Sequence, residues 1–239
     1  MLNLLRRIST IFQWNNESEE TPHKQPQGNS ALMSVQGVVT SLCTNYGWIN
    51  ESIFFHTEIV CDNMPVRIGI NVIALVEEDE TTHVLNAIKV KIINDPVDSN
   101  DPSKLGKRFC IKCVTHVMQD NIYVSKDFSF PIHLFSGEFK PFKGDLVLVA
   151  YSMIPGTSNV NIHSVSPLSF QNMQEVCITR LDGRTGVVEP CMFFTLDSLH
   201  TLPGYSPGLY DIVNVVAVDS ILPQYSQRVV SMIPTDMLY

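Results

Sequence analysis

Apolar and polar side chains alternate with a period of two in short runs between residues 35 and 93, and β-branched residues are frequent in these runs. Polar turns separate the runs, and no stretch between them has the spacing of a long helix. Short antiparallel strands in a segment of this length suit a small closed barrel, because closure leaves no exposed sheet edge. An SH3-like barrel also fits the number of strands. The alternation predicts five strands, at Val35–Thr40, Tyr46–Ile49, Ile53–His56, Ile70–Val76 and Val84–Ile93.

A pattern of four spaced positions occurs three times along the chain. In each copy a threonine is followed after seven residues by Gly or Ile, after eight more by Phe, and after fourteen more by a Gly that opens an apolar run. Self-similarity at intervals of 60 to 75 residues indicates repeated structural units rather than one interwoven domain. By alternation, the three phenylalanines are expected to point into their barrels. The copies are Thr40, Gly47, Phe55 and Gly69; Thr115, Ile122, Phe130 and Gly144; and Thr179, Gly186, Phe194 and Gly208.

The polar, proline-containing stretches place the boundaries of these units. We assign the three barrels to residues 34–94, 105–168 and 172–236, behind a flexible tail at 1–33. The linker at 94–105 is expected to let the first barrel unfold without the other two. Within the tail, apolar residues at helical spacing predict a short amphipathic helix that packs on the first repeat or frays. A mitochondrial presequence or a surface-seeking helix is the alternative.

Composition and charge narrow the classes of function. The chain has 239 residues, a net charge of −8 and a pI near 5.3, which argues against tight unspecific binding to nucleic acid or to an anionic membrane. Its six cysteines are thinly spread, as in a reduced cytosolic protein. No run of apolar residues approaches the length of a membrane span.

The strands of the first repeat carry a recognisable pattern, Tyr46-Gly-Trp-Ile49 followed by Ile53-Phe-Phe-His56. This pattern resembles cold-shock and S1-like OB domains, and Gly144-Asp145 of the second repeat matches their Gly-Asp turn. Across all three repeats the chain is similar to the cancer/testis antigen 55 family of germline proteins, and similar units occur in the N-terminal region of a germline RNA helicase. The resemblance implies an all-β chain of three tandem small five-stranded OB-like barrels preceded by a flexible tail. It also implies a non-enzymatic role in sperm development, in the cytoplasm or on vesicles or the acrosome, with a link to autophagy.

The candidate nucleic-acid site is the aromatic face of the first repeat. Because alternate side chains share one face of a strand, Tyr46 and Trp48 are expected to lie beside Phe54 and His56. Four rings on one face suit the stacking of unpaired bases. The alternative is that Trp48 and the phenylalanines fill the barrel core. Between residues 34 and 93 there are three Lys or Arg against seven Asp or Glu, which disfavours a single-strand binder. The second and third repeats have lost most of the rings.

No motif in the chain points to an enzyme or to a cofactor. Phosphate-binding loops, metalloprotease helices and nucleophile elbows are absent from the sequence. Cys110 and Cys113 form a CxxC pair, but zinc needs two further ligands and His116 alone does not supply them. We expect the two cysteines on opposite faces of a strand, and we expect no metal site and no cofactor.

Two functions of different classes follow. The first is a non-enzymatic germline adaptor that binds protein partners, including ubiquitin-like autophagy modifiers, for which Tyr210 and Val213 are the candidate docking residues. That docking motif is loose, and strand pairing inside a barrel would cover it. The alternative is a single-stranded RNA binder that acts through Tyr46, Trp48, Phe54 and His56 of the first repeat.

Overall fold

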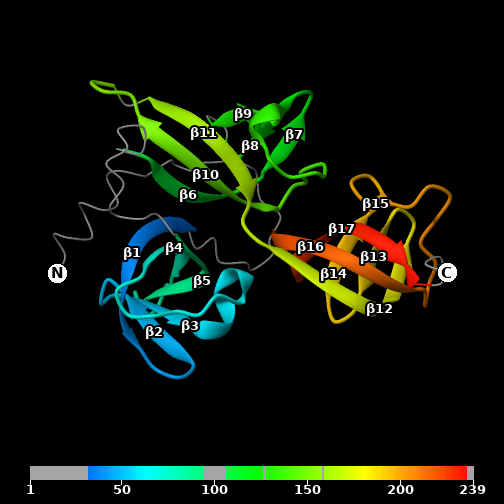
Figure 1. The fold of residues 1–239 in the computed structure, drawn as a ribbon, viewed down its shortest axis with the longest axis horizontal. Coiled ribbons are helices and arrows are strands. Elements are labelled where there is room, and N and C mark those ends of the chain that lie inside the picture. Colours follow the sequence, from blue (N-terminus) through cyan, green and yellow to red (C-terminus); the bar gives the residue numbers. More distant parts are fainter. Residues whose placement is uncertain (1–31, 94–105, 126–127, 158, 236–239) are drawn as a thin grey trace.

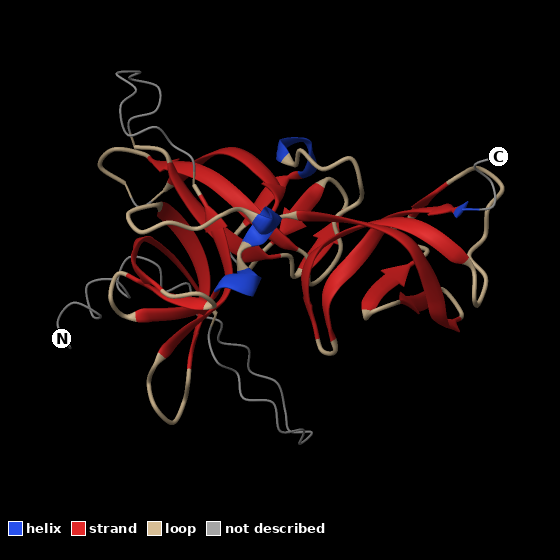
Figure 2. Cartoon of the chain, turned by 60° about the horizontal axis from the view of Figure 1, so that its bottom comes forward, coloured by secondary structure: helices blue, strands red, loops and turns tan. Residues whose placement is uncertain are grey.

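The computed structural model describes residues 32–93, 106–125, 128–157 and 159–235. Within these ranges the chain is almost entirely β, with three short 3-10 helices at Thr57–Ile59 (η1), Cys61–Asn63 (η2) and Ile132–Leu134 (η3). Figure 1 shows three units in chain order, and Figure 2 shows how little helix they contain. The helix predicted within residues 1–31 lies outside the described residues, and the exact domain boundaries remain a prediction.

The first unit, β1 to β5, is a closed barrel. Its strands follow the order β1-β2-β3-β5-β4, with a parallel β3–β5 pair and antiparallel neighbours elsewhere. This order is the Greek-key order of an OB fold, so the OB-like prediction is confirmed and the SH3-like alternative is not needed. The strands are β1 (Met33–Leu42), β2 (Tyr46–Ile49), β3 (Ile53–His56), β4 (Asn71–Glu78) and β5 (Leu85–Ile92).

The third unit, β12 to β17, closes in the same way. Its sheet runs β14-β13-β12-β16-β17, and a parallel β14–β17 pair joins the two ends, while β15 adds to β17. The β14–β17 pair takes the place of the β3–β5 pair of the first unit. The strands are β12 (Phe170–Asp182), β13 (Thr185–Val188), β14 (Met192–Thr195), β15 (His200–Thr201), β16 (Ile212–Leu222) and β17 (Tyr225–Pro234).

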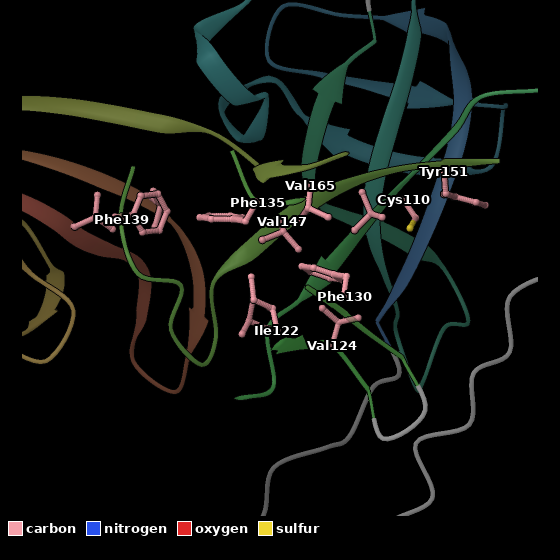
Figure 3. Close-up of a cluster of buried hydrophobic side chains, with 13 residues drawn as sticks. Cys110, Ile122, Val124, Phe130, Phe135, Phe139, Val147, Tyr151 and Val165 are labelled. Atoms are coloured by element: carbon pink, nitrogen blue, oxygen red, sulfur yellow. The ribbon is translucent and has the colours of Figure 1, made fainter. Parts of the chain in front are cut away.

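The second unit, β6 to β11, differs from the predicted closed barrel of five strands. It consists of two three-stranded sheets, β11-β10-β6 and β7-β8-β9, and Phe135, which follows η3, forms an isolated bridge with Val165 of β11. Its β9 strand has three residues and ends at Pro131, which has no N–H to donate to a neighbouring strand. The strands are β6 (Arg108–Cys113), β7 (His116–Met118), β8 (Asn121–Tyr123), β9 (Ser129–Pro131), β10 (Leu146–Met153) and β11 (Val160–Pro167). Side chains from both sheets meet in its core (Figure 3).

The repeat spacing has a packing explanation. Gly47 pairs with Phe55 across β2 and β3, and a Cβ added to Gly47 would lie 2.7 Å from the Phe55 ring. Gly186 and Phe194 repeat this arrangement in the third unit, with a closest approach of 2.4 Å. All three repeat phenylalanines are buried, as alternation predicted, with Phe130 at 1% exposure. In the first and third units the glycine therefore leaves room for the ring of its cross-strand partner, whereas the second unit has Ile122 at this position.

The three units also pack on one another, against the expectation that the linker separates them. In β4, Val72 and Ala74 face the barrel core, while Ile73 and Leu75 pack against Ile111 and Leu146 of the second unit. A strand that is buried on both faces has a continuous run of apolar residues in the sequence, and the runs that follow the repeat glycines are continuous in this way. A similar junction places Val218 and Val230 of the third unit in the core of the second unit.

Two ion pairs also join the units, one between the first and third units and one between the second and third. Asp219 on β16 is 2% exposed, accepts a hydrogen bond from Ser169, and pairs with Lys89 on β5 of the first unit. Arg228 on β17 is fully buried and donates two hydrogen bonds to Asp145 of the second unit, at 2.8 and 2.7 Å. Truncating one partner of such a pair leaves an uncompensated buried charge, so these pairs join the units tightly.

Candidate functional site

The aromatic face of the first unit is formed by β2 and β3. Strand pairing sets Tyr46 opposite His56 and Trp48 opposite Phe54. The alternating residues Gly47, Ile49, Ile53 and Phe55 are buried in the barrel, so the four rings lie on the outer face. Figure 1 places β2 and β3 at the bottom of the first unit, away from β6 and β10. The fold therefore brings together all four residues of the predicted stacking face.

Phe54 is the centre of this aromatic cluster. Its ring centroid lies 5.8 Å from that of Tyr46, 5.4 Å from that of Trp48 and 4.9 Å from that of His56. The Trp48 and His56 rings meet Phe54 edge to face, at 70° and 89°, whereas Tyr46 is tilted by 33°. Such contacts hold the rings against each other before any ligand arrives.

The cluster is accessible, and a hollow lies beside it. Tyr46 is 42% exposed, and Trp48 and Phe54 are half-buried. A side-chain hydrogen bond with Cys43 raises the pKa of the Tyr46 hydroxyl, so the phenol is neutral at physiological pH. The hollow is shallow, about 350 Å³ in volume, and Thr40, Ser41, Trp48 and Glu51 line it.

The turn between β2 and β3 positions Glu51 at this hollow. Its backbone adopts a positive φ of 60°, and its N–H donates to Thr40 Oγ1 at 3.0 Å. Thr40 Oγ1 donates in turn to the Trp48 carbonyl at 3.1 Å. Through Thr40, the backbone of Glu51 is thus hydrogen-bonded to β2, the strand that carries Trp48. Sequence reasoning treated this segment only as a polar turn, since nothing in the pattern of one turn shows which side chain lines a hollow.

Two of the three Lys and Arg side chains of the first unit are engaged in ion pairs. Lys89 pairs with Asp219, and Lys91 pairs with Asp62 at 2.9 Å and also donates to the Leu168 carbonyl. Arg67 is the remaining Lys or Arg between residues 34 and 93, and it makes no ion pair within the described residues. The aromatic face thus lacks the positive groove that tracks a phosphate backbone.

The other repeats use their rings differently. In the second unit His116 stacks on Tyr123, with centroids 4.3 Å apart and planes within 8°. Sequence reasoning considered His116 only as a metal ligand, and its stacking partner was missed because the contact joins two strands. In the third unit Phe193 contacts Tyr225 of its own unit and Phe142 of the second unit. Neither unit repeats the four-ring face.

The CxxC pair lies on β6, where its two thiols belong to different clusters. Cys110 faces the core of the second unit, and Cys113 packs into the junction with the first unit, so the expected opposite faces are confirmed. Burial raises the pKa of each thiol to about 11. Among the described residues, no group of three His, Cys, Asp or Glu side chains is arranged to hold a metal ion.

The candidate docking pair of the third unit is divided between surface and core. Tyr210 is 73% exposed in the loop before β16, whereas Val213 is fully buried and lies between β12 and β17 in the sheet. A partner that reads both side chains on an extended strand would need β16 to leave its sheet. The two residues therefore do not form one accessible face in this fold.

Comparison with known proteins finds two family models that match parts of this chain. Residues 85–168 match the family model described as the cancer/testis antigen 55 N-terminal domain. This segment of the chain is similar to the cancer/testis antigen 55 family. The predicted resemblance is thereby confirmed. Residues 15–74, which include the aromatic face, match the N-terminal OB domain of RNA helicase Mov10l1-like proteins.

The relatives of this chain include much longer proteins. The chain is 35% identical to RNA helicase Mov10l1 of Homo sapiens over 97% of its own length and 20% of the helicase. It is 37% identical to RNA helicase Mov10l1 of Mus musculus over 78% of its length and 16% of that protein. The chain thus spans about a fifth of the first of these relatives.

Solved structures similar to this chain have low TM-scores. Drosophila Unr CSD456 has a TM-score of 0.24 at 12% identity, covering 87% of this chain and 99% of that one. A Streptococcus pneumoniae multidomain protein with nucleic acid binding domains has a TM-score of 0.19 at 13% identity, covering 82% and 72%. The assignment of the OB-like fold rests on the strand topology itself. No described helix has the length and apolar character needed to cross a membrane.

Proposed function

We propose that this protein is a non-enzymatic germline adaptor that acts in sperm development by presenting the aromatic face of its first unit to a protein partner. The observation that carries this proposal is that the face has accessible aromatic rings, while the lysines of the same unit are held in ion pairs. Four clustered rings are accessible on β2 and β3, while Lys89 and Lys91 of the same unit are held in ion pairs away from them. Exposed aromatic side chains without a positive groove favour a protein ligand.

The packing of the three units supports an adaptor role. A shared apolar cluster and the Lys89–Asp219 pair hold the first unit against the other two. A second apolar cluster and the buried Asp145–Arg228 pair hold the second unit against the third. A binding face on such a body keeps a defined orientation relative to surfaces on the other units. An adaptor needs this property, since it must present more than one contact at a time.

The chemistry of the described residues favours binding over catalysis. The matched families are named for OB and N-terminal domains, and the Mov10l1-like match covers the N-terminal OB domain. Burial raises the pKa of Cys61 to about 12, so this thiol is protonated and unreactive near neutral pH. Reduced cysteines throughout the described part of the chain fit a cytoplasmic location. Vesicles or the acrosome are the places where an adaptor with a role in autophagy would act.

Autophagy modifiers are the weaker class of partner for this adaptor. Their docking mode requires an extended strand with two accessible side chains. Val213 is buried in a paired strand, so Tyr210 alone remains accessible. The aromatic face of the first unit does not depend on opening a sheet, and it is therefore the preferred docking site.

The proposal is tested by capture from testis extract with the full chain and with two variants. Trp48→Leu removes an aromatic ring from the face, and Tyr210→Ala removes an exposed ring at the far unit as a matched control. We expect a nuclease-resistant protein partner at near-equal stoichiometry that Trp48→Leu loses and Tyr210→Ala keeps. Recovery of the same proteins with both variants would refute the proposed face.

A second candidate function is single-stranded RNA binding through the same face. The observation in its favour is that Tyr46, Trp48, Phe54 and His56 do assemble on one surface, in the part of the chain that matches the Mov10l1-like OB domain. Each stacked base contributes about 1–3 kcal/mol, so loss of one ring would weaken binding at least about fivefold.

Fluorescence anisotropy with labelled oligouridine near physiological salt tests this second function. RNA binding requires that Trp48→Leu and Phe54→Leu both weaken the complex, while the exposed Tyr210→Ala control binds as the wild type does. Absence of binding by the wild type removes this candidate and leaves the adaptor.

A further inference from the structure

The hollow beside the aromatic face combines two chemical features. One wall is the half-buried indole of Trp48, and another includes Glu51, whose side chain is in no hydrogen bond or ion pair within the described residues. Thr40 and Ser41 complete the lining with hydroxyl groups. An aromatic ring attracts a cation over its face, and a nearby carboxylate adds a charged acceptor for its N–H groups. Together these groups suit a positively charged side chain.

The charge of the first unit favours the same ligand. Residues 34–93 contain seven Asp or Glu and three Lys or Arg, and two of those cations are already paired. Glu51 and Glu58 are exposed acids in and near the β2–β3 segment. An acidic surface raises the local concentration of a basic partner and repels a phosphate backbone. Charge complementarity thus separates a basic peptide from an RNA strand at this face.

We propose that the aromatic face binds a basic peptide segment of a partner protein, with an arginine side chain stacked on Trp48 and hydrogen-bonded to Glu51. This inference rests on the proposed adaptor function and names the chemistry of the partner. Arginine suits the hollow better than lysine, because its planar guanidinium stacks on a ring and presents paired N–H groups to a carboxylate. The neighbouring rings of Phe54 and Tyr46 take the apolar stems of adjacent side chains.

A binding experiment with the full chain tests the stacking of arginine on Trp48 and its hydrogen bonds to Glu51 separately. The probe is a synthetic peptide in which arginine and glycine alternate, measured by isothermal titration calorimetry. A citrulline peptide has the same shape without the charge, and a lysine peptide keeps the charge without the planar group. Glu51→Gln removes the carboxylate charge from an exposed position, and Glu58→Gln is the matched control at an exposed acid outside the hollow.

The arginine peptide is expected to bind at least about tenfold more tightly than the citrulline peptide, with the lysine peptide between them. Glu51→Gln should weaken the arginine peptide about fivefold or more, Trp48→Leu should abolish binding, and Glu58→Gln should change the affinity less than about twofold. Circular dichroism of each variant verifies that the fold is kept. Equal binding of arginine and citrulline peptides, or no effect of Glu51→Gln, would overturn the inference.

Two further outcomes separate this inference from the functions on which it rests. If the arginine peptide does not bind but Trp48→Leu still loses a protein partner from extract, the cationic chemistry is wrong and the adaptor function stands. If oligouridine binds this face and displaces the arginine peptide, the face is a nucleic-acid site and both the inference and the adaptor proposal fail.

Discussion

Arg228→Met directly tests how the second and third units are held together. The guanidinium is fully buried, and its Nε and Nη2 donate to the two Asp145 oxygens at 2.8 and 2.7 Å. Nη1 donates to Ser198 Oγ at 2.7 Å, and the guanidinium also lies 5.5 Å from the centroid of the Phe142 ring. Methionine has a similar length but no charge, so the Asp145 carboxylate would stay buried without its cation.

The expected loss of folding stability follows from the buried Asp145 carboxylate that is left without its cation. Removing one partner of a buried ion pair destabilises by about 3–5 kcal/mol, because the remaining charge keeps its desolvation cost. In a chain of this length each kcal/mol lowers the melting temperature by about 2–4 °C, which gives a drop of about 6–20 °C. Arg180→Met is the matched control, since Arg180 is exposed and its contact with Asp182 is 3.7 Å long. A surface pair of this kind contributes about 1 kcal/mol or less.

The assay is urea unfolding followed by two probes. Far-UV circular dichroism reports all strands, and Trp48 fluorescence in a Trp14→Phe background reports the first unit. If the junctions couple the units, Arg228→Met shifts both transitions together. The double variant with Asp145→Leu should recover part of the loss, because it also removes the buried charge. The recovery is partial, since the Phe142 N–H then lacks the Asp145 acceptor at 2.8 Å, and Ser198 Oγ and the Lys140 carbonyl still lack the Arg228 donor. A shift for Arg228→Met no larger than that for Arg180→Met would refute the structural role of this pair.

Three further predictions concern single positions. Phe55→Ala should destabilise by about 3–5 kcal/mol because the ring is fully buried, whereas Phe54→Ala should cost much less; a larger effect of Phe54→Ala in thermal melts would reverse the two faces. Lys89→Met should destabilise by about 3 kcal/mol or more, since the buried Asp219 carboxylate then lacks its cation, and an unchanged urea midpoint would contradict this. Iodoacetamide at pH 8 should modify exposed Cys43 quickly and Cys61 slowly, because burial raises the Cys61 pKa to about 12; equal rates by mass spectrometry would show that the junction opens.

The core of each unit was predictable because it depends on local periodicity. Alternation along β2 and β3 identified Phe55 as buried and Phe54 as outward, and pairing of the two strands then brought the four rings together. The repeat marks the position of Gly47, and the reason for this glycine is a local contact. That reason, the ring of Phe55 against the glycine, requires only two adjacent strands. Local pattern therefore gave both the barrel and the candidate face.

The contacts between units were not predictable from local pattern. Arg228 and Asp145 are 83 residues apart, and Lys89 and Asp219 are 130 apart, so no spacing links them. A signal was present in the apolar run of β4, where Ile73 and Leu75 occupy positions that a solvent-facing strand would fill with polar residues. The linker composition argued for separate units, but it carries no information on whether the surfaces beside it match.

The sequence by itself determined the barrel fold of the first and third repeats, the inward phenylalanines and the residues of the aromatic face. Only the tertiary structure decided that the second unit stays split into two sheets, that the units share buried ion pairs, and that Glu51 lines a hollow beside Trp48. Which side chains of a strand point inward depends on the alternation of adjacent residues, so it can be predicted from the sequence. Charge pairing and hollows depend on surfaces that meet only after folding, and only then do Lys89 and Lys91 become unavailable to a ligand.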